Sequence, residues 1–131
     1  MDIPDIEKLK DNVYITLSWN ENRIICRRNL VRILGSPKYI CVRVNKDFTS
    51  LILRPCEATD PMSFKVPENL FTDKGSRFRI TSKSFVRGLL DKNGYAENCT
   101  YAFKGIYSEQ YNTVFVSLEN GKEITAEKDP D

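Results

Sequence analysis

Two pairs of basic residues have the spacing needed to bind neighbouring phosphate groups. Arg28 and Arg32 stand four residues apart in a segment with helical periodicity, so their side chains would project from one face. Lys83 and Arg87 repeat this spacing in a later helical segment. Guanidinium groups make bidentate bonds to phosphate, and each neutralised phosphate releases counterions. The two pairs therefore predict contact with a polyanion, although a short amphipathic helix can also expose Arg or Lys simply as its solvated face.

The charge distribution along the 131 residues favours the same kind of partner. The net charge is only +2, but residues 20–54 carry eight basic residues against two acidic ones. Residues 74–87 add five basic residues and no acid, while both ends of the chain are acidic. A charge asymmetry of this kind indicates a polyanionic partner such as nucleic acid.

The chain offers little catalytic or metal-binding chemistry. It contains no histidine, no Gly-rich phosphate loop and no Cys-x-x-Cys pair. We therefore expect a protein that is not an enzyme and that uses no cofactor or metal, with its cysteines as buried free thiols. A carboxylate pair formed by Asp60 and Glu68, or Cys99 as a nucleophile, are the alternatives that the sequence leaves open. The four cysteines are Cys26, Cys41, Cys56 and Cys99.

Composition places the chain among ordinary globular proteins. It is 40% hydrophobic and 29% charged, and its length is typical of one domain. No apolar run reaches the roughly 20 residues that a transmembrane helix needs, and the acidic start differs from a signal peptide. We expect a soluble, cytoplasmic, single-domain protein with no membrane partner.

The elements that position the basic residues occur twice in the same order. In the first copy a strand at 23–25 precedes a helix at 27–34 and a hairpin of two strands, 39–44 and 50–54. The second copy has a strand at 78–80, a helix at 82–90 and strands at 100–107 and 113–118. At a constant offset of 55, Ile25 aligns with Ile80 and Val31 aligns with Val86. This alignment predicts an internal repeat.

The repeat predicts a mainly β (α+β) fold, a small β-barrel built from two β-α-β-β units around a pseudo-twofold axis. We divide the single domain into an N-terminal segment, a first repeat, a linker, a second repeat and a mobile tail. Their boundaries are 1–12, 13–57, 58–73, 74–121 and 122–131. A further strand is expected at 13–19, a short helix at 2–10, an extended stretch at 63–66, a helical turn after Pro67 and a short strand near Ile124.

Both copies resemble the AbrB/MraZ swapped-hairpin family. The similarity covers roughly residues 20–54 and 74–118, and it is carried by residues 23–35 and 74–90, where a basic strand leads into a short helix with an inner basic residue. Cys26 and Thr81 stand where the family has proline. The resemblance implies a small β-barrel that binds DNA through basic residues, commonly as an oligomer. Carried over by position, the DNA-binding residues would be Arg23, Arg27, Arg28 and Arg32 in the first copy and Arg77, Arg79, Lys83 and Arg87 in the second.

Two functions are compatible with these features. The first is a non-catalytic regulator of transcription that binds duplex DNA through the basic residues of both repeats, as a monomer or a homodimer. The second is a protein-interaction module, such as an accessory or inhibitor protein of a mobile element, in which the barrel is a scaffold and its edges recruit a protein partner. The acidic termini favour the second function, and the paired basic helices favour the first.

Overall fold

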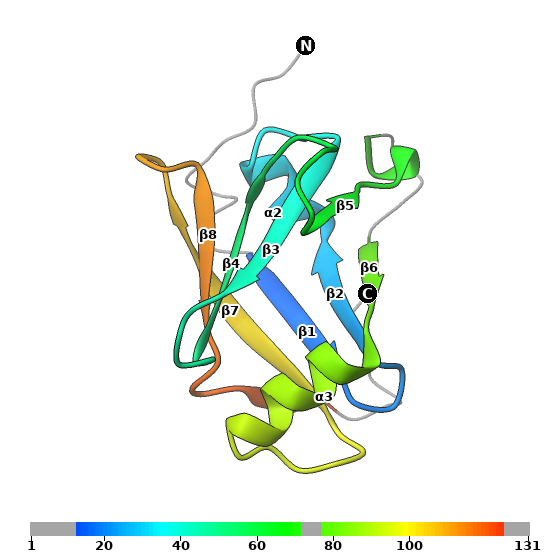
Figure 1. Cartoon of the computed structure of the whole chain (residues 1–131), viewed down its shortest axis with the longest axis vertical. Helices are drawn as coiled ribbons and strands as arrows, with labels where there is room; N and C mark the ends of the chain where they lie inside the picture. The colour runs from blue at the N-terminus through cyan, green and yellow to red at the C-terminus, as the bar shows by residue number, and fades with distance from the viewer. Residues whose placement is uncertain (1–12, 72–76, 125–131) are drawn as a thin grey trace.

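A computed structural model describes residues 13–71 and 77–124 (Figure 1). The first half contains β1 (Tyr14–Ser18), β2 (Arg23–Arg27), α2 (Arg28–Ile33), β3 (Tyr39–Val44) and β4 (Ser50–Pro55). β5 (Ser63–Lys65) and a short 3-10 helix, η1 (Glu68–Phe71), follow. The second half contains β6 (Arg77–Thr81), α3 (Lys83–Lys92), β7 (Thr100–Ser108), β8 (Thr113–Ser117) and β9 (Lys122–Ile124). These elements confirm the expected ones, except that the helix at 2–10 falls outside the described residues.

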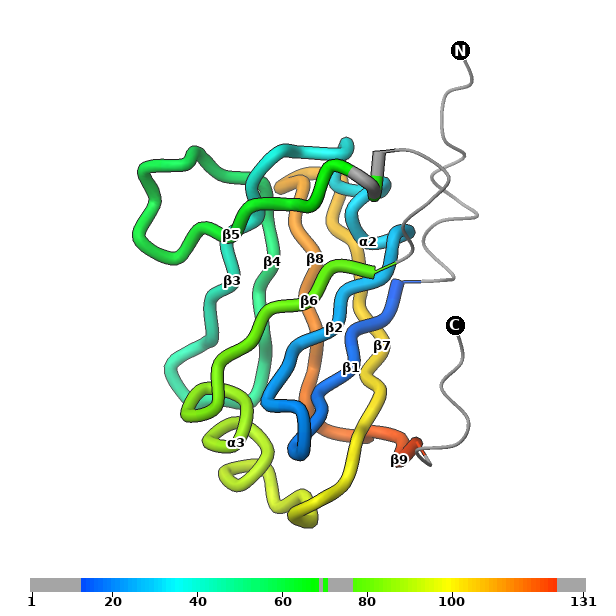
Figure 2. The backbone as a smooth tube through the Cα atoms, turned by 90° about the vertical axis from the view of Figure 1, so that its right-hand side faces the viewer, coloured from blue at the N-terminus to red at the C-terminus, as the bar shows by residue number. Residues whose placement is uncertain are grey.

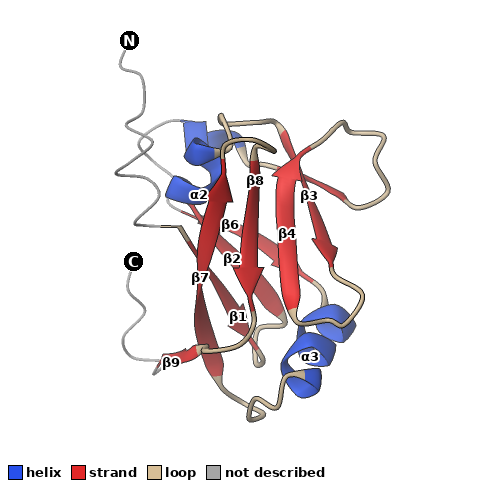
Figure 3. Ribbon diagram, turned by 90° about the vertical axis from the view of Figure 1, so that its left-hand side faces the viewer, coloured by secondary structure: helices blue, strands red, loops and turns tan. Residues whose placement is uncertain are grey.

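The strands form a nearly closed antiparallel barrel. Its order is β5-β3-β4-β8-β7-β1-β2-β6, with β9 added beside β7. Figure 2 faces β6, β2, β1 and β7, and Figure 3 faces β7, β8, β4 and β3 on the other side. Alternate side chains point inward and form one core, in which Leu17, Ile24 and Leu53 are fully buried. The mainly β barrel predicted from the sequence is therefore confirmed.

Exchanging the two halves leaves the strand order unchanged, as a pseudo-twofold axis requires. The exchange replaces β1 by β5, β2 by β6, β3 by β7 and β4 by β8, and each of the latter by the former. When β5 and β6 at the two ends of the order are counted as neighbours, every strand keeps equivalent neighbours. β2 pairs with β6 and β4 pairs with β8 across the axis. β5 is thus the counterpart of β1, although it lies in the segment 58–73 that we interpreted as a linker.

The constant offset of 55 is wrong in the strands. Ile24 and Ile80 are paired and both face the core, whereas Ile25 pairs with Arg79 on the outer face. The equivalent strand residues are 54 apart, because β2 begins at Arg23 and β6 begins at Arg77. The two helices nevertheless begin 55 apart, since Ser82 separates β6 from α3 while α2 follows β2 directly. A shift of one residue moves every strand side chain to the opposite face.

β7 joins the two sides of the barrel by changing its partner halfway along. Its first five residues pair with β1, and the residues from Gly105 onward pair with β8. The backbone N–H of Gly105 donates to the carbonyl oxygen of Val13 at 2.7 Å. A Cβ atom at this position would lie 2.8 Å from Cγ1 of Val114 and 3.0 Å from Cγ1 of Val13. The strand can therefore approach its neighbours this closely only with glycine.

The remaining elements lie at the ends of the barrel. α2 and α3 lie at opposite ends (Figure 1). None of the helices in the described residues is long and apolar enough to cross a membrane. The strand expected near Ile124 is confirmed as β9, which pairs with the start of β7. The tail that we predicted to be mobile from residue 122 therefore begins with paired residues, and residues 125–131 lie outside the described chain.

Candidate nucleic-acid interface

The pairing of β2 with β6 gathers basic side chains on one outer face. The two strands are in register so that Arg27 lies opposite Arg77 and Arg23 lies opposite Thr81. Because side chains alternate along a strand, Arg79 projects outward on the same face, between these two pairs. The sheet thus brings together residues that lie 50 to 58 positions apart in the sequence. We call this surface, formed by Arg23, Arg27, Arg77 and Arg79, the basic face.

The four guanidinium groups of the basic face differ in their surroundings. Arg79 is exposed, and no carboxylate of the described chain forms an ion pair with it. Nη1 of Arg23 lies 3.3 Å from Oε2 of Glu21, and the side chains are 40% and 55% exposed. A surface ion pair of this kind is worth about 0–1 kcal/mol, so a phosphate could replace the carboxylate at small cost. Arg27 and Arg77 are half-buried and each is already engaged in an interaction.

The helical basic residues extend the basic face at two ends instead of forming one surface of their own. Arg28 begins α2 and follows Arg27 directly, whereas Lys83 begins α3 close to the strand end that carries Thr81. Since α2 and α3 lie at opposite ends of the barrel, the two predicted helical pairs are far apart (Figure 1). Arg32 is exposed in the last turn of α2.

Arg87 has a structural contact that the sequence did not indicate. Its guanidinium carbon lies 4.8 Å from the centre of the Trp19 ring, and Nη2 donates to the carbonyl oxygen of Trp19 at 3.4 Å. The side chain is half-buried beside the ring. Stacking of a guanidinium group on an indole is favourable, so Arg87 holds α3 against the end of β1. Its position four residues after Lys83 gave no sign of this.

A cluster of thiol and carboxylate groups lies where the loop between β4 and β5 meets the buried Cys41 of β3. The Sγ atoms of Cys41 and Cys56 and a carboxylate oxygen of Asp60 lie within 4.8 Å of one another. Such a set could hold a thiophilic cation such as Zn²⁺. However, Nη2 of Arg43 lies 3.2 Å from both carboxylate oxygens of Asp60. A guanidinium group in this place repels a cation, so the cluster is not assigned as a metal site.

The protonation of this cluster follows from its contacts. The backbone N–H of Met62 donates to Oδ1 of Asp60 at 2.9 Å, and this bond, with Arg43, lowers the pKa of the carboxyl group. Desolvation raises the pKa of the Cys56 thiol. Sequence reasoning missed the cluster because Cys41 and Cys56 are 15 residues apart and meet only through the pairing of β3 with β4. Asp60 thus accepts hydrogen bonds from Met62 and Arg43.

No protein-family model, curated protein or solved structure matches this chain.

Proposed function

We propose that this protein is a non-catalytic DNA-binding regulator of transcription that contacts the phosphate backbone of duplex DNA through the basic face. The single observation that supports the proposal is the register of β2 and β6, which gathers Arg23, Arg27, Arg77 and Arg79 on one outer surface. These residues come from both repeats, so the surface exists only when the two halves are assembled.

The dimensions of the basic face suit a nucleic-acid backbone. Each of the two strands has five residues, so the face is about 16 Å long at about 3.3 Å per residue. Arg28 and Lys83 lengthen it at the helix starts. Contacts from arginine to phosphate fix a protein on the duplex without reading its sequence. The proposal therefore predicts binding that depends strongly on salt and weakly on base sequence.

A salt titration tests the proposal. A fluorescently labelled duplex of about 20 base pairs is titrated with the protein, and the association constant is measured by anisotropy at several salt concentrations. Four phosphate contacts predict a slope of log K against log salt of about −3.6, because each contact contributes about −0.9. Arg79→Ala removes one exposed guanidinium group and should reduce the slope by about 1.

The matched control is Arg54→Ala. Arg54 is exposed on β4, which is separated from β2 by three intervening strands in the barrel order. Arg54→Ala lowers the net charge of the protein by one, as Arg79→Ala does, so it measures the effect of overall charge alone. Absence of binding at low salt, or an equal loss of affinity in Arg54→Ala and Arg79→Ala, would overturn the proposal.

A further inference from the structure

The barrel is open at one seam, between β5 and β6. These two strands stand at the two ends of the strand order, and no backbone ladder joins them. The pseudo-twofold axis shows that a ladder is absent here: β1 pairs with both β7 and β2, whereas its counterpart β5 pairs with β3 and not with β6, the counterpart of β2. Among the described residues no strand pairs with the outer edge of β5 or of β6, although the backbone N–H of Ser63 already donates to the carbonyl oxygen of Asp60 at 3.0 Å. The remaining N–H and C=O groups of an open edge can accept an added strand.

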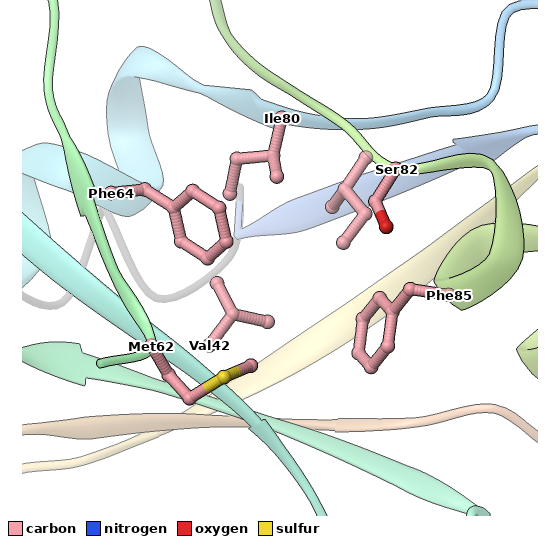
Figure 4. A pocket seen from close by; sticks show the side chains of 7 residues that line it. Val42, Met62, Phe64, Ile80, Ser82 and Phe85 are labelled. Carbon is pink, nitrogen blue, oxygen red and sulfur yellow. The ribbon is translucent and has the colours of Figure 1, made fainter.

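An apolar cavity lies along this seam. It has a volume of about 200 Å³. Figure 4 shows Phe64, Ile80, Met62 and Phe85 around the cavity. Phe64 belongs to β5, Ile80 to β6 and Phe85 to α3, and Met62 directly precedes β5. Phe64 and Phe85 are only half-buried, and Met62 is 36% exposed. The rim of the cavity is thus partly exposed, whereas Ile24, Val42 and Ile80 in its lining are buried. The cavity offers an apolar side chain a place out of water.

The rim of the seam carries positive charge on both sides. Lys65 follows Phe64 on β5 and Arg79 precedes Ile80 on β6, so the alternation of side chains turns both basic residues outward. Both are exposed, and no described carboxylate forms an ion pair with either of them. The seam therefore has an apolar interior and a basic exterior. Along each edge strand apolar and basic side chains alternate, so a complementary partner strand would alternate in the same way.

From this complementarity we propose that the seam binds an extended segment of a partner protein, as a strand between β5 and β6, in which apolar and acidic residues alternate. The backbone of the segment bonds to the two open edges, its apolar side chains enter the cavity, and its carboxylates face Lys65 and Arg79. This mode of recognition takes affinity from main-chain bonds and specificity from alternate side chains. The inference does not rest on DNA binding, because an apolar cavity offers a charged phosphate group no favourable contact.

A synthetic peptide tests the inference. A fluorescein-labelled decapeptide in which leucine or valine alternates with glutamate is titrated with the full chain, and anisotropy gives the dissociation constant. We expect saturable binding, with amide shifts in the nuclear magnetic resonance spectrum concentrated in Ser63–Lys65 and Arg77–Thr81. A peptide of the same composition with its glutamates grouped together should bind at least about tenfold more weakly, a difference of about 1.4 kcal/mol.

Two variants with a matched control locate the site. Met62→Glu places a charge in the mouth of the cavity and should weaken binding about tenfold, because a carboxylate there must be desolvated. Lys65→Glu should also weaken binding, whereas Lys122→Glu, an equal charge reversal at an exposed residue of β9, should not. Met62, Lys65 and Lys122 are exposed, so the three variants should fold, and circular dichroism verifies this.

The outcomes separate this inference from the proposed function. Neither Met62 nor Lys65 belongs to the basic face, so if both proposals hold, these variants should lose no more DNA affinity than Lys122→Glu, which also lowers the net charge. Equal binding of the alternating and grouped peptides, or amide shifts elsewhere, would overturn the seam as a strand site. A dimer in light scattering that Met62→Glu dissociates would also overturn it, because a second copy of this chain would then be the occupant.

Discussion

Replacing Gly105 with alanine should destabilise the protein, although alanine is normally the better strand residue. Alanine reduces the freedom of the unfolded chain, which favours folding by about 0.5–1 kcal/mol. The added Cβ would lie 2.8 Å from Val114 and 3.0 Å from Val13, both of which are fully buried. Carbon atoms pack best at about 3.5–4.0 Å, so β7 or its neighbours must shift, and overpacking of this kind costs about 1–3 kcal/mol. We therefore expect a net loss of about 1–2 kcal/mol.

The assay is urea denaturation followed by the fluorescence of Trp19, the single tryptophan. Gly88→Ala is the matched control, because Gly88 lies in α3 and a Cβ there would meet nothing within 4 Å. The same chemical change should stabilise the protein by about 0.5–1 kcal/mol at this helical position. The steric reasoning is refuted if Gly105→Ala is neutral or stabilising while Gly88→Ala behaves as expected.

Two further predictions concern a buried thiol and the Trp19 contact. Complete burial raises the pKa of Cys26 to about 12 from an ordinary value of 9.0. The unfolded chain loses this proton above pH 9 while the folded protein keeps it, so the thiol should lower stability by up to about 1.4 kcal/mol per pH unit as the pH rises from 9 towards 12. Urea melts of wild type and Cys26→Ala check this, and equal pH slopes would contradict it. Arg87→Ala should cost about 1 kcal/mol and shift the emission of Trp19 to longer wavelength, because the guanidinium group no longer covers the ring. An unchanged emission maximum would show that the stacking does not persist in solution.

Local patterns were sufficient to predict most of the elements. The alternation in residues 39–44 and 50–54 predicted the first hairpin, since one face of each strand must be apolar to cover the core. The helix predicted at 27–34 is followed by Gly35, which has a φ of 91°, a conformation that glycine adopts readily and that commonly follows a helix end. These features depend on residues close in sequence, which is why the sequence reveals them.

Features that depend on distant pairing were not predicted. The role of Ser63–Lys65 as the counterpart of β1 comes from its partner β3, and a segment of three residues has too little periodicity to show this. The one-residue difference between strand and helix offsets was hidden because Ile25 and Ile80 are both apolar, although they face opposite sides. The pairing of Arg27 with Arg77 also depends on residues far apart in sequence, so neither it nor the open seam was predicted.

The pairing of β1 with β7 has a consequence for how the chain folds during synthesis. Tyr14 lies opposite Lys104, so β1 can pair with β7 only after a further 90 residues have been synthesised. At about 5–20 residues per second, a ribosome needs on the order of ten seconds to make that partner. The first half would meanwhile leave the ribosome with apolar strand faces uncovered. Contacts of such sequence separation also slow the search for the native state.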